Sequence, residues 1–216
     1  MSTLVVQHPT LRRPAIDAFA GLIGRPPDQL GPGLALWRRV AIEGGRLDAV
    51  AQAHAVDAEI VAPDLRLNAF GLAAFDMDST LITIECVDEI ADFAGRKAEV
   101  AAITEAAMRG DIADYDDSLR RRVALLAGLP VSVLQRVWDE RLSLSPGAET
   151  LIRRIKACGL QVLLVSGGFS FFTDRLAARL GIQHVRSNHL ELADGRLTGR
   201  LQGEIVNAGV KRRTLE

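Results

Sequence analysis

Two aspartates that lie two positions apart, Asp76 and Asp78, are the residues in this sequence whose spacing most clearly suggests chemistry. They follow LAAF at 72–75, a short apolar run that predicts a buried strand. Open α/β sheets bind their ligands at the carboxyl ends of strands. Two carboxylates at such a place could serve as nucleophile and general acid/base, or could hold a cation. Taken alone, the pair also fits a solvated acidic turn.

The residues that follow this pair exclude a calcium loop of the EF-hand type. Such a loop needs glycine at its sixth position and glutamate at its twelfth. Counted from Asp76, those two positions hold Leu81 and Val87. The 4 histidines are scattered along the chain and show no metal-ligand spacing.

The composition is that of a folded protein with little electrostatic bias. Hydrophobic residues make up 48% of the 216 residues, enough for a core, and the formal net charge is −1. We therefore expect no nucleic-acid partner, and no apolar run approaches the ~18 residues of a membrane span. The N-terminus lacks the basic and apolar regions of a secretion signal, so we expect a cytoplasmic protein. Cys86 and Cys158 lie in apolar helical contexts and are predicted to be core thiols.

Strand and helix patterns alternate in the second half of the chain and predict a parallel α/β core. One helix is expected to stop at Gly159, and a buried strand at 162–165 then leads into Ser-Gly-Gly at 166–168. A second helix is expected to close at Gly181. HLEL, Asp-Gly and RLTGRL follow it and predict a hairpin.

Helical periodicity from about residue 87 to 142 interrupts these strand–helix units. We therefore expect residues 71–84 and 146–216 to form the core, and residues 85–145 to form a helical cap. Residues 1–70 are predicted to be a short N-terminal module of unknown role. GRPPDQLGPG predicts a loop in this module, between two helices marked by apolar positions: Ile16, Phe19 and Ile23 in the first, and Leu47, Val50 and His54 in the second.

Several segments resemble the haloacid dehalogenase superfamily over about residues 70–216, in the same order. FDMDSTLI is similar to its first motif, Ser-Gly-Gly to its second, and Lys211 to its third-motif lysine. The predicted cap resembles the phosphoserine phosphatase branch, through ECVDEIADFAG, ITEAAMRGD and YDDSLRRRVALLAGL. The resemblance implies a Rossmann-like parallel-sheet core. It also implies hydrolysis of O-phospho-L-serine to L-serine and phosphate, the last step of serine biosynthesis.

The resemblance further implies a role for each motif residue. Asp76 would attack phosphorus and form an aspartyl phosphate, and Asp78 would protonate the leaving oxygen and then activate water. Ser166, the Gly167 amide and Lys211 would bind the phosphate. Mg²⁺ would be the cofactor, held in part by the Asp76 carboxylate and the Asp78 carbonyl. By composition alone, Ser-Gly-Gly is an ordinary turn and an isolated lysine a surface residue, so motif order carries these assignments.

Specificity is expected in the cap. Glu85 and Arg122 match the residues with which the family binds the amine and the carboxylate of its substrate. Glu85 could equally be an acid that favours a helix N-terminus. By resemblance, Tyr115 and Met108 are expected to be pocket walls, although positions in a helical core fit them equally well.

Helix geometry gives independent support for Arg122 over its two neighbours. At 100° per residue, Arg122 lies about 60° from Leu119, between Leu119 and Leu126, whereas Arg120 and Arg121 rotate toward solvent. An arginine within an apolar stripe needs an anionic partner. Alternatively, its stem could cover the core while its charged head reaches water.

The chain departs from the family pattern after Lys211. The family continues to a Gly-Asp-Gly-x-x-Asn-Asp loop that supplies a further acidic magnesium ligand, and no such motif occurs in this sequence. We expect a truncated form of a longer protein, or else a defective paralogue, with weak magnesium binding and little hydrolysis as it stands. Two other functions stay open: a related phosphatase or phosphotransferase for another small phosphorylated substrate, and a non-catalytic serine or phosphoserine binder. The sequence does not indicate an oligomeric state.

Overall fold

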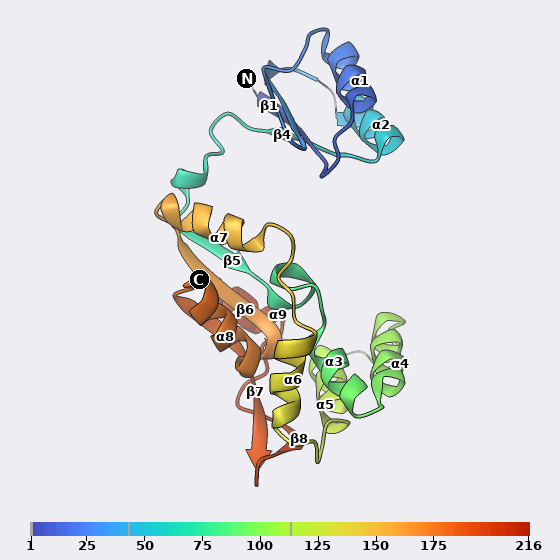
Figure 1. Ribbon diagram of the computed structural model, residues 1–216, viewed down its shortest axis with the longest axis vertical. Helices are drawn as coiled ribbons and strands as arrows, with labels where there is room; N and C mark the ends of the chain where they lie inside the picture. The colour runs from blue at the N-terminus through green and yellow to red at the C-terminus, as the bar shows by residue number, and fades with distance from the viewer. Residues whose placement is uncertain (1, 43, 113) are drawn as a thin grey trace. The chain divides into compact units, whose positions relative to one another are not determined.

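The computed structural model describes residues 2–42, 44–112 and 114–216. The chain divides into two compact units, Met1–Ala69 and Phe70–Glu216, each with a sheet and a hydrophobic core of its own (Figure 1). The described residues include no helix that is long and apolar enough to cross a membrane.

The N-terminal unit is a four-stranded antiparallel sheet, in the order β2-β3-β1-β4, that packs against two helices. Its elements in chain order are β1 (Ser2–Gln7), α1 (Arg13–Ile23), β2 (Gln29–Gly31), β3 (Leu34–Val40), α2 (Gly44–His54) and β4 (Asp57–Val61).

Both predicted helices of this unit are present, but its sheet was not predicted. Alternate residues of β1, Leu4 and Val6, are buried, yet Val5 between them is apolar too, so no clean strand alternation is visible. GRPPDQLGPG, predicted to be a loop, contains β2. Phe19 on α1 and Trp37 on β3 fill the core with their ring centroids 6.2 Å apart.

The second unit is built on a mixed sheet in the order β5-β6-β7-β8. The strands are β5 (Leu72–Phe75), β6 (Gln161–Phe169), β7 (His184–Ala193) and β8 (Arg196–Gln202). The first three run parallel, and β8 returns antiparallel to β7 through a turn at Asp194 and Gly195, both of which have positive φ. The predicted parallel α/β class, the two strands and the hairpin are therefore confirmed. Burial was predicted for both strands and is found in β6, but β5 has no buried residue and its first residue, Leu72, is exposed.

Helices cover both faces of this sheet, which explains why the apolar run at 162–165 is continuous rather than alternating. Val162 and Leu164 belong to the main core with α7 (Ala148–Ala157) and α8 (Ser170–Leu180). Leu163 and Val165 face the other way, toward α9 (Ala208–Leu215), where they pack with Val206 and Val210.

Strand β6 is longer than predicted. We expected it to end at Val165, but it continues through Ser-Gly-Gly to Phe169. The pairing with β7 shifts register between Val165 and Phe169, and Phe169 then lies opposite Asn188. The irregularity falls on Ser-Gly-Gly, where the backbone leaves regular pairing before α8 begins.

A helical segment separates β5 from β6 in the sequence. After the short turn η2 (Met77–Leu81) come α3 (Cys86–Phe93), α4 (Lys97–Met108), α5 (Tyr115–Ala124) and α6 (Ser132–Glu140). The buried residues Val100, Leu119 and Val123 extend the main core into this segment. The expected helical insert is therefore present.

The two cysteines differ in environment, which corrects one expectation. Cys86 is buried at the start of α3, as predicted. Cys158, predicted to be a core thiol, is exposed. It caps the C-terminus of α7, whose buried face is formed by Ile152 and Ile155, so the apolar context of Cys158 in the sequence does not reflect its side-chain direction.

Candidate active site

A cavity of about 400 Å³ lies where β5 and β6 end, beside the helical segment. Its lining includes every residue to which the sequence assigned a catalytic, substrate-binding or metal-binding role: Asp76, Asp78, Glu85, Arg122, Ser166, Gly167 and Lys211. They come from the ends of two parallel strands, from two helices of the segment and from α9.

Asp76 follows the last residue of β5 and is held by two donors. Its Oδ1 accepts a hydrogen bond of 2.7 Å from the Met77 backbone N–H. Its Oδ2 lies 2.5 Å from Nζ of Lys211 on α9. The carboxylate is thus fixed at the mouth of a strand and placed beside a positive charge, as a nucleophile for an anionic substrate needs to be.

Asp78 occupies a different environment although it is only two residues away. Burial raises its pKa to about 7, and the negative charges of Glu85 and Asp76 act in the same direction. Hydrogen bonds from Cys86 oppose this shift, and one of them joins the Cys86 N–H to Asp78 Oδ1 at 3.3 Å. A carboxyl with this pKa exists in both protonation states near neutral pH, so it can donate and accept a proton.

Both glycines of the Ser-Gly-Gly segment, near the end of β6, lie close against side chains of neighbouring elements. A Cβ on Gly168 would lie 2.7 Å from Asp78 Oδ2 and 2.5 Å from Met77 Cε. A Cβ on Gly167 would overlap the hydroxyl of Tyr115. The Ser166 side chain is buried, and its Oγ accepts a 2.9 Å hydrogen bond from the Gly168 N–H. The Ser-Gly-Gly segment therefore lies against Met77 and Asp78 through Gly168, and against Tyr115 of the helical segment through Gly167.

Glu85 lines the cavity at the N-cap of α3. Its Oε1 accepts a 2.6 Å hydrogen bond from the Ser79 hydroxyl. Ser79 has a φ of 51°, an unusual backbone conformation for a residue with a side chain. The turn η2 therefore places the aspartate pair and the hydroxyl that orients Glu85 within one short segment.

Arg122 lines the cavity, whereas the two arginines before it do not. It is half-buried, and its Nε donates to the Ser118 carbonyl at 3.4 Å. Arg120 and Arg121 are exposed and pair with acids one turn earlier on α5. The helix face predicted for Arg122 is the face that the structure shows.

The two expected pocket walls have different outcomes. Tyr115 lines the cavity, and although 44% of the residue is exposed, desolvation of its hydroxyl raises the pKa of that group, while the charge of Arg122 opposes the shift. Met108 is 84% exposed at the end of α4 and takes no part in the lining, so that expectation was wrong. Met108 is exposed because it lies in the last turn of α4, a helix in which Val100 is the buried residue.

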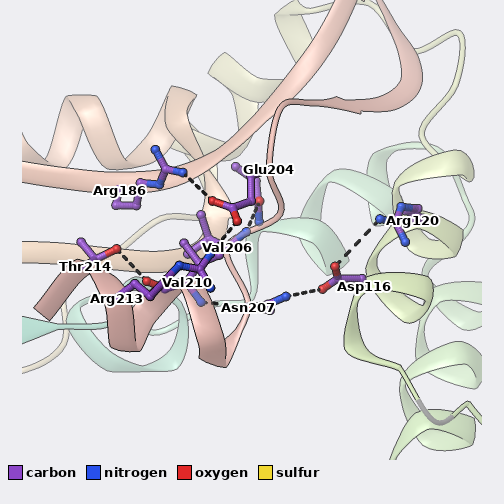
Figure 2. A network of polar contacts seen from close by, with 10 residues as sticks. Asp116, Arg120, Arg186, Glu204, Val206, Asn207, Val210, Arg213 and Thr214 are labelled. Carbon is purple, nitrogen blue, oxygen red and sulfur yellow. Dashed lines mark hydrogen bonds and ion pairs between the residues drawn. The ribbon is translucent and has the colours of Figure 1, made fainter. Parts of the chain in front are cut away.

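The sequence did not suggest Asn207, although it too lines the cavity. Its Oδ1 accepts a 3.1 Å hydrogen bond from the Val210 N–H and so caps α9. Its Nδ2 donates to Asp116 Oδ1 at 3.1 Å, across 91 positions of sequence (Figure 2). An asparagine before a short helical stretch is a local capping signal, but nothing local indicates the second bond. The other lining residues are Val87, Leu119, Gly168, Phe169, Val206 and Ala208.

The donor chemistry of the acidic pair fits a hard cation such as Mg²⁺, which prefers oxygen ligands in a near-octahedral arrangement. Asp76 and Asp78 supply oxygen donors at the cavity. Within the described ranges, no group of three or more His, Cys, Asp or Glu residues is placed to hold a metal ion. These two residues would therefore provide part of a magnesium site.

Comparisons with known proteins agree with this geometry. The haloacid dehalogenase-like hydrolase family matches residues 73–214. A phosphoserine phosphatase of Polaromonas sp. is 61% identical over 160 residues, which cover 72% of this chain and 68% of that protein. The crystal structure of a probable phosphoserine phosphatase from Vibrio cholerae, in its unliganded form, has a TM-score of 0.80 and 33% identity over 99% of this chain and 67% of its own.

A structure described as a phospho-aspartyl intermediate analogue of phosphoserine phosphatase has a TM-score of 0.62 and 39% identity, covering 67% of this chain and 68% of its own. The chain thus spans about two thirds of the length of these relatives. It belongs to the haloacid dehalogenase-like hydrolase family. Within that family its resemblance to the phosphoserine phosphatases is confirmed.

Proposed function

We propose that the protein hydrolyses O-phospho-L-serine to L-serine and phosphate, the last step of serine biosynthesis. One observation carries the proposal. A single cavity holds an aspartate beside a lysine at its phosphate end, and Glu85 and Arg122 toward the helical segment. Such a cavity offers complementary charge to all three ionic groups of the substrate: phosphate, ammonium and carboxylate.

In the first step, the carboxylate of Asp76 attacks phosphorus. A bond forms between an Asp76 oxygen and phosphorus, and the bond between phosphorus and the serine oxygen breaks. Asp78, in its protonated form, gives its proton to the departing serine oxygen. The pKa of about 7 makes this form available near neutral pH. L-serine leaves, and an aspartyl phosphate remains.

In the second step, Asp78 accepts a proton from a water molecule as that water attacks phosphorus. The bond between Asp76 and phosphorus breaks, which restores the carboxylate and releases inorganic phosphate. One carboxyl therefore acts first as acid and then as base, and each step prepares it for the other.

Phosphoryl transfer depends mainly on positioning and charge neutralisation. The Ser166 hydroxyl, the Gly167 N–H and the Lys211 ammonium would hold the phosphate oxygens in this cavity. The Asp76 carboxylate and the Asp78 carbonyl would hold Mg²⁺, which when bound neutralises charge on the transferred group.

The helical segment would act as the cap that selects the substrate. Arg122 would bind the carboxylate of the amino acid and Glu85 its ammonium group. Glu85 is already oriented by Ser79, and Arg122 is held by the carbonyl of Ser118 on its own helix. Both groups are therefore partly ordered before substrate binds, which lowers the entropy cost of recognition.

The test is phosphate release from O-phospho-L-serine, with and without Mg²⁺, by this chain and by a longer natural form. Phosphoethanolamine, which lacks the carboxylate, and 3-phosphooxypropanoate, which lacks the amine, are the comparison substrates. We expect O-phospho-L-serine to be preferred over both by at least about tenfold, since each loses one buried ionic contact. Asp76→Asn should abolish release while leaving the fold intact. Equal rates for the three substrates, or full activity in Asp76→Asn, would contradict the proposal.

A further inference from the structure

The first two residues of α5, Tyr115 and Asp116, contact the end of β6 and the N-cap of α9, respectively. The Tyr115 hydroxyl packs so closely on Gly167 that no Cβ fits there. Asp116 Oδ1 accepts the 3.1 Å hydrogen bond from Asn207 Nδ2 (Figure 2). The N-terminus of α5, the helix that carries Arg122, thus contacts the two elements expected to bind the phosphate: the Ser-Gly-Gly segment of β6 and the start of α9.

A buried asparagine joins these two elements to each other. Asn188, in the middle of β7, is 1% exposed. Its Nδ2 donates to the Gly167 carbonyl at 2.7 Å, and its Oδ1 accepts from the Val206 N–H at 2.8 Å. The contacts therefore form a closed ring, in the order Tyr115, Gly167, Asn188, Val206, Asn207 and Asp116.

Asn207 is the member of this ring that also sets the position of Lys211. Its Oδ1 caps α9, and its backbone carbonyl accepts a 2.9 Å hydrogen bond from the Lys211 N–H. The two polar atoms of its side chain thus serve different partners: the oxygen holds α9, and the nitrogen holds α5. A change that spares the oxygen and alters only the nitrogen tests the second function separately.

We propose that Asn207 is a positioning residue. Its hydrogen bond to Asp116, here called the latch, holds the helical segment against α9 and thereby sets the distance between Arg122 and Lys211. That separation must match the distance between the carboxylate and the phosphate of one substrate molecule. The identity of this substrate rests on the proposed function, whereas the latch itself rests on the contacts of the ring.

Asn207→Asp tests the latch because aspartate caps helices as well as asparagine does. The cap on α9 is kept, but a carboxylate oxygen replaces the donor that faces Asp116, and two negative charges then meet. We expect faster backbone hydrogen exchange in 115–124 than in the parent chain, with little change in 208–215. The affinity for O-phospho-L-serine, measured by calorimetry without magnesium, should fall about tenfold, which corresponds to about 1.4 kcal/mol.

A second substitution should reverse these effects. In Asn207→Asp combined with Asp116→Asn, the new amide at 116 can donate a hydrogen bond to the new carboxylate at 207. Backbone hydrogen exchange in 115–124 should therefore slow to near the parent rate. The affinity for O-phospho-L-serine should return to within about threefold of the parent value, or about 0.7 kcal/mol. The matched control combines Asn207→Asp with Asp117→Asn, which removes the neighbouring exposed carboxylate of the same turn and should restore neither property.

Equal recovery in both double variants would overturn the latch, because general relief of charge would then explain it. No effect of Asn207→Asp on exchange in 115–124 would overturn it as well. If exchange follows the expected pattern but O-phospho-L-serine does not bind to any variant, the latch stands and the proposed substrate fails. If binding is intact and indifferent to these substitutions, the latch does not set the separation of Arg122 from Lys211.

Discussion

Lys211 Nζ and Asp76 Oδ2 lie 2.5 Å apart and join positions that are 135 residues distant in the sequence. Both side chains keep partial contact with solvent, with 31% of the lysine and 42% of the aspartate exposed. The pair is therefore accessible to a ligand rather than sealed in the core. A bound phosphate would bring further negative charge to the ammonium group and share it with Asp76.

Lys211→Met should lower phosphoserine turnover by at least about 10²-fold, because the missing charge no longer neutralises the transferring phosphoryl group. Methionine keeps most of the apolar stem, so α9 should remain folded. The matched control is Arg212→Met on the next position of α9, where the side chain is exposed and pairs only with Glu216 among the described contacts. Steady-state phosphate release measures both variants, and equal losses in the two would exclude a specific role for Lys211.

Arg122→Ala should weaken phosphoserine turnover by on the order of 10²–10³-fold, since loss of one partner from a desolvated charge pair costs about 2–5 kcal/mol. Arg121→Ala, one position earlier on α5, should change turnover little, because its exposed side chain pairs with Asp117 outside the cavity. The ratio of kcat/KM between the two variants is the measurement. A ratio near one would contradict the assignment of the helix face.

The sequence predicted elements whose signals are local. The apolar runs of β5 and β6, the Asp-Gly turn of the hairpin and the glycines that end α7 and α8 each lie within a few residues of what they determine. The direction of Arg122 followed from the angle per residue of a helix. The motif residues around the cavity were found because a family resemblance supplied their order.

Contacts between distant segments could not be predicted in this way. The bond from Asn207 to Asp116 spans 91 positions, and no periodicity connects them. The N-terminal sheet was missed because apolar residues occur on both faces of β1 and β3, which hides the alternation of a half-buried strand. Cys158 was misplaced for a related reason, since composition near a helix end does not give the direction of one side chain.

Gly168→Ala should impair the site although the residue has no side chain to lose. A Cβ would meet Asp78 Oδ2 at 2.7 Å and Met77 Cε at 2.5 Å, and Met77 is fully buried, so neither neighbour can move freely. We expect a loss of unfolding free energy of about 1–3 kcal/mol and a larger proportional loss of turnover. Gly209→Ala on α9, where a Cβ meets only Asn207 Oδ1 at 3.3 Å and Arg213 Nη1 at 3.6 Å, is the milder comparison. Urea unfolding and phosphate release together separate the two effects.

Asp78 should make the protein less stable as pH rises from about 4 to 7, in the absence of magnesium. Its pKa is about 7 in the folded chain and 3.8 in its ordinary state, so in this window the folded protein holds a proton that the unfolded chain has released. Protonated Asp78 therefore contributes its full stabilisation below its ordinary pKa of 3.8, and this stabilisation is lost as the pH rises through its folded-state pKa of about 7. Asp78→Asn cannot ionise, so its stability relative to the parent should increase between about pH 5 and pH 8, by on the order of 1–2 kcal/mol given the partial exposure of the site.

Asp174→Asn on α8 is the control for this prediction, because it removes an exposed carboxylate of the same unit that lies outside the cavity. Its stability relative to the parent should stay nearly constant over the same pH range. Urea unfolding in buffer with a chelator measures all three chains, so that no bound cation alters the charge balance at Asp78. A constant difference between Asp78→Asn and the parent from about pH 5 to pH 8 would mean that Asp78 titrates alike in both states. Burial would then not supply the shift that lets Asp78 act as both acid and base.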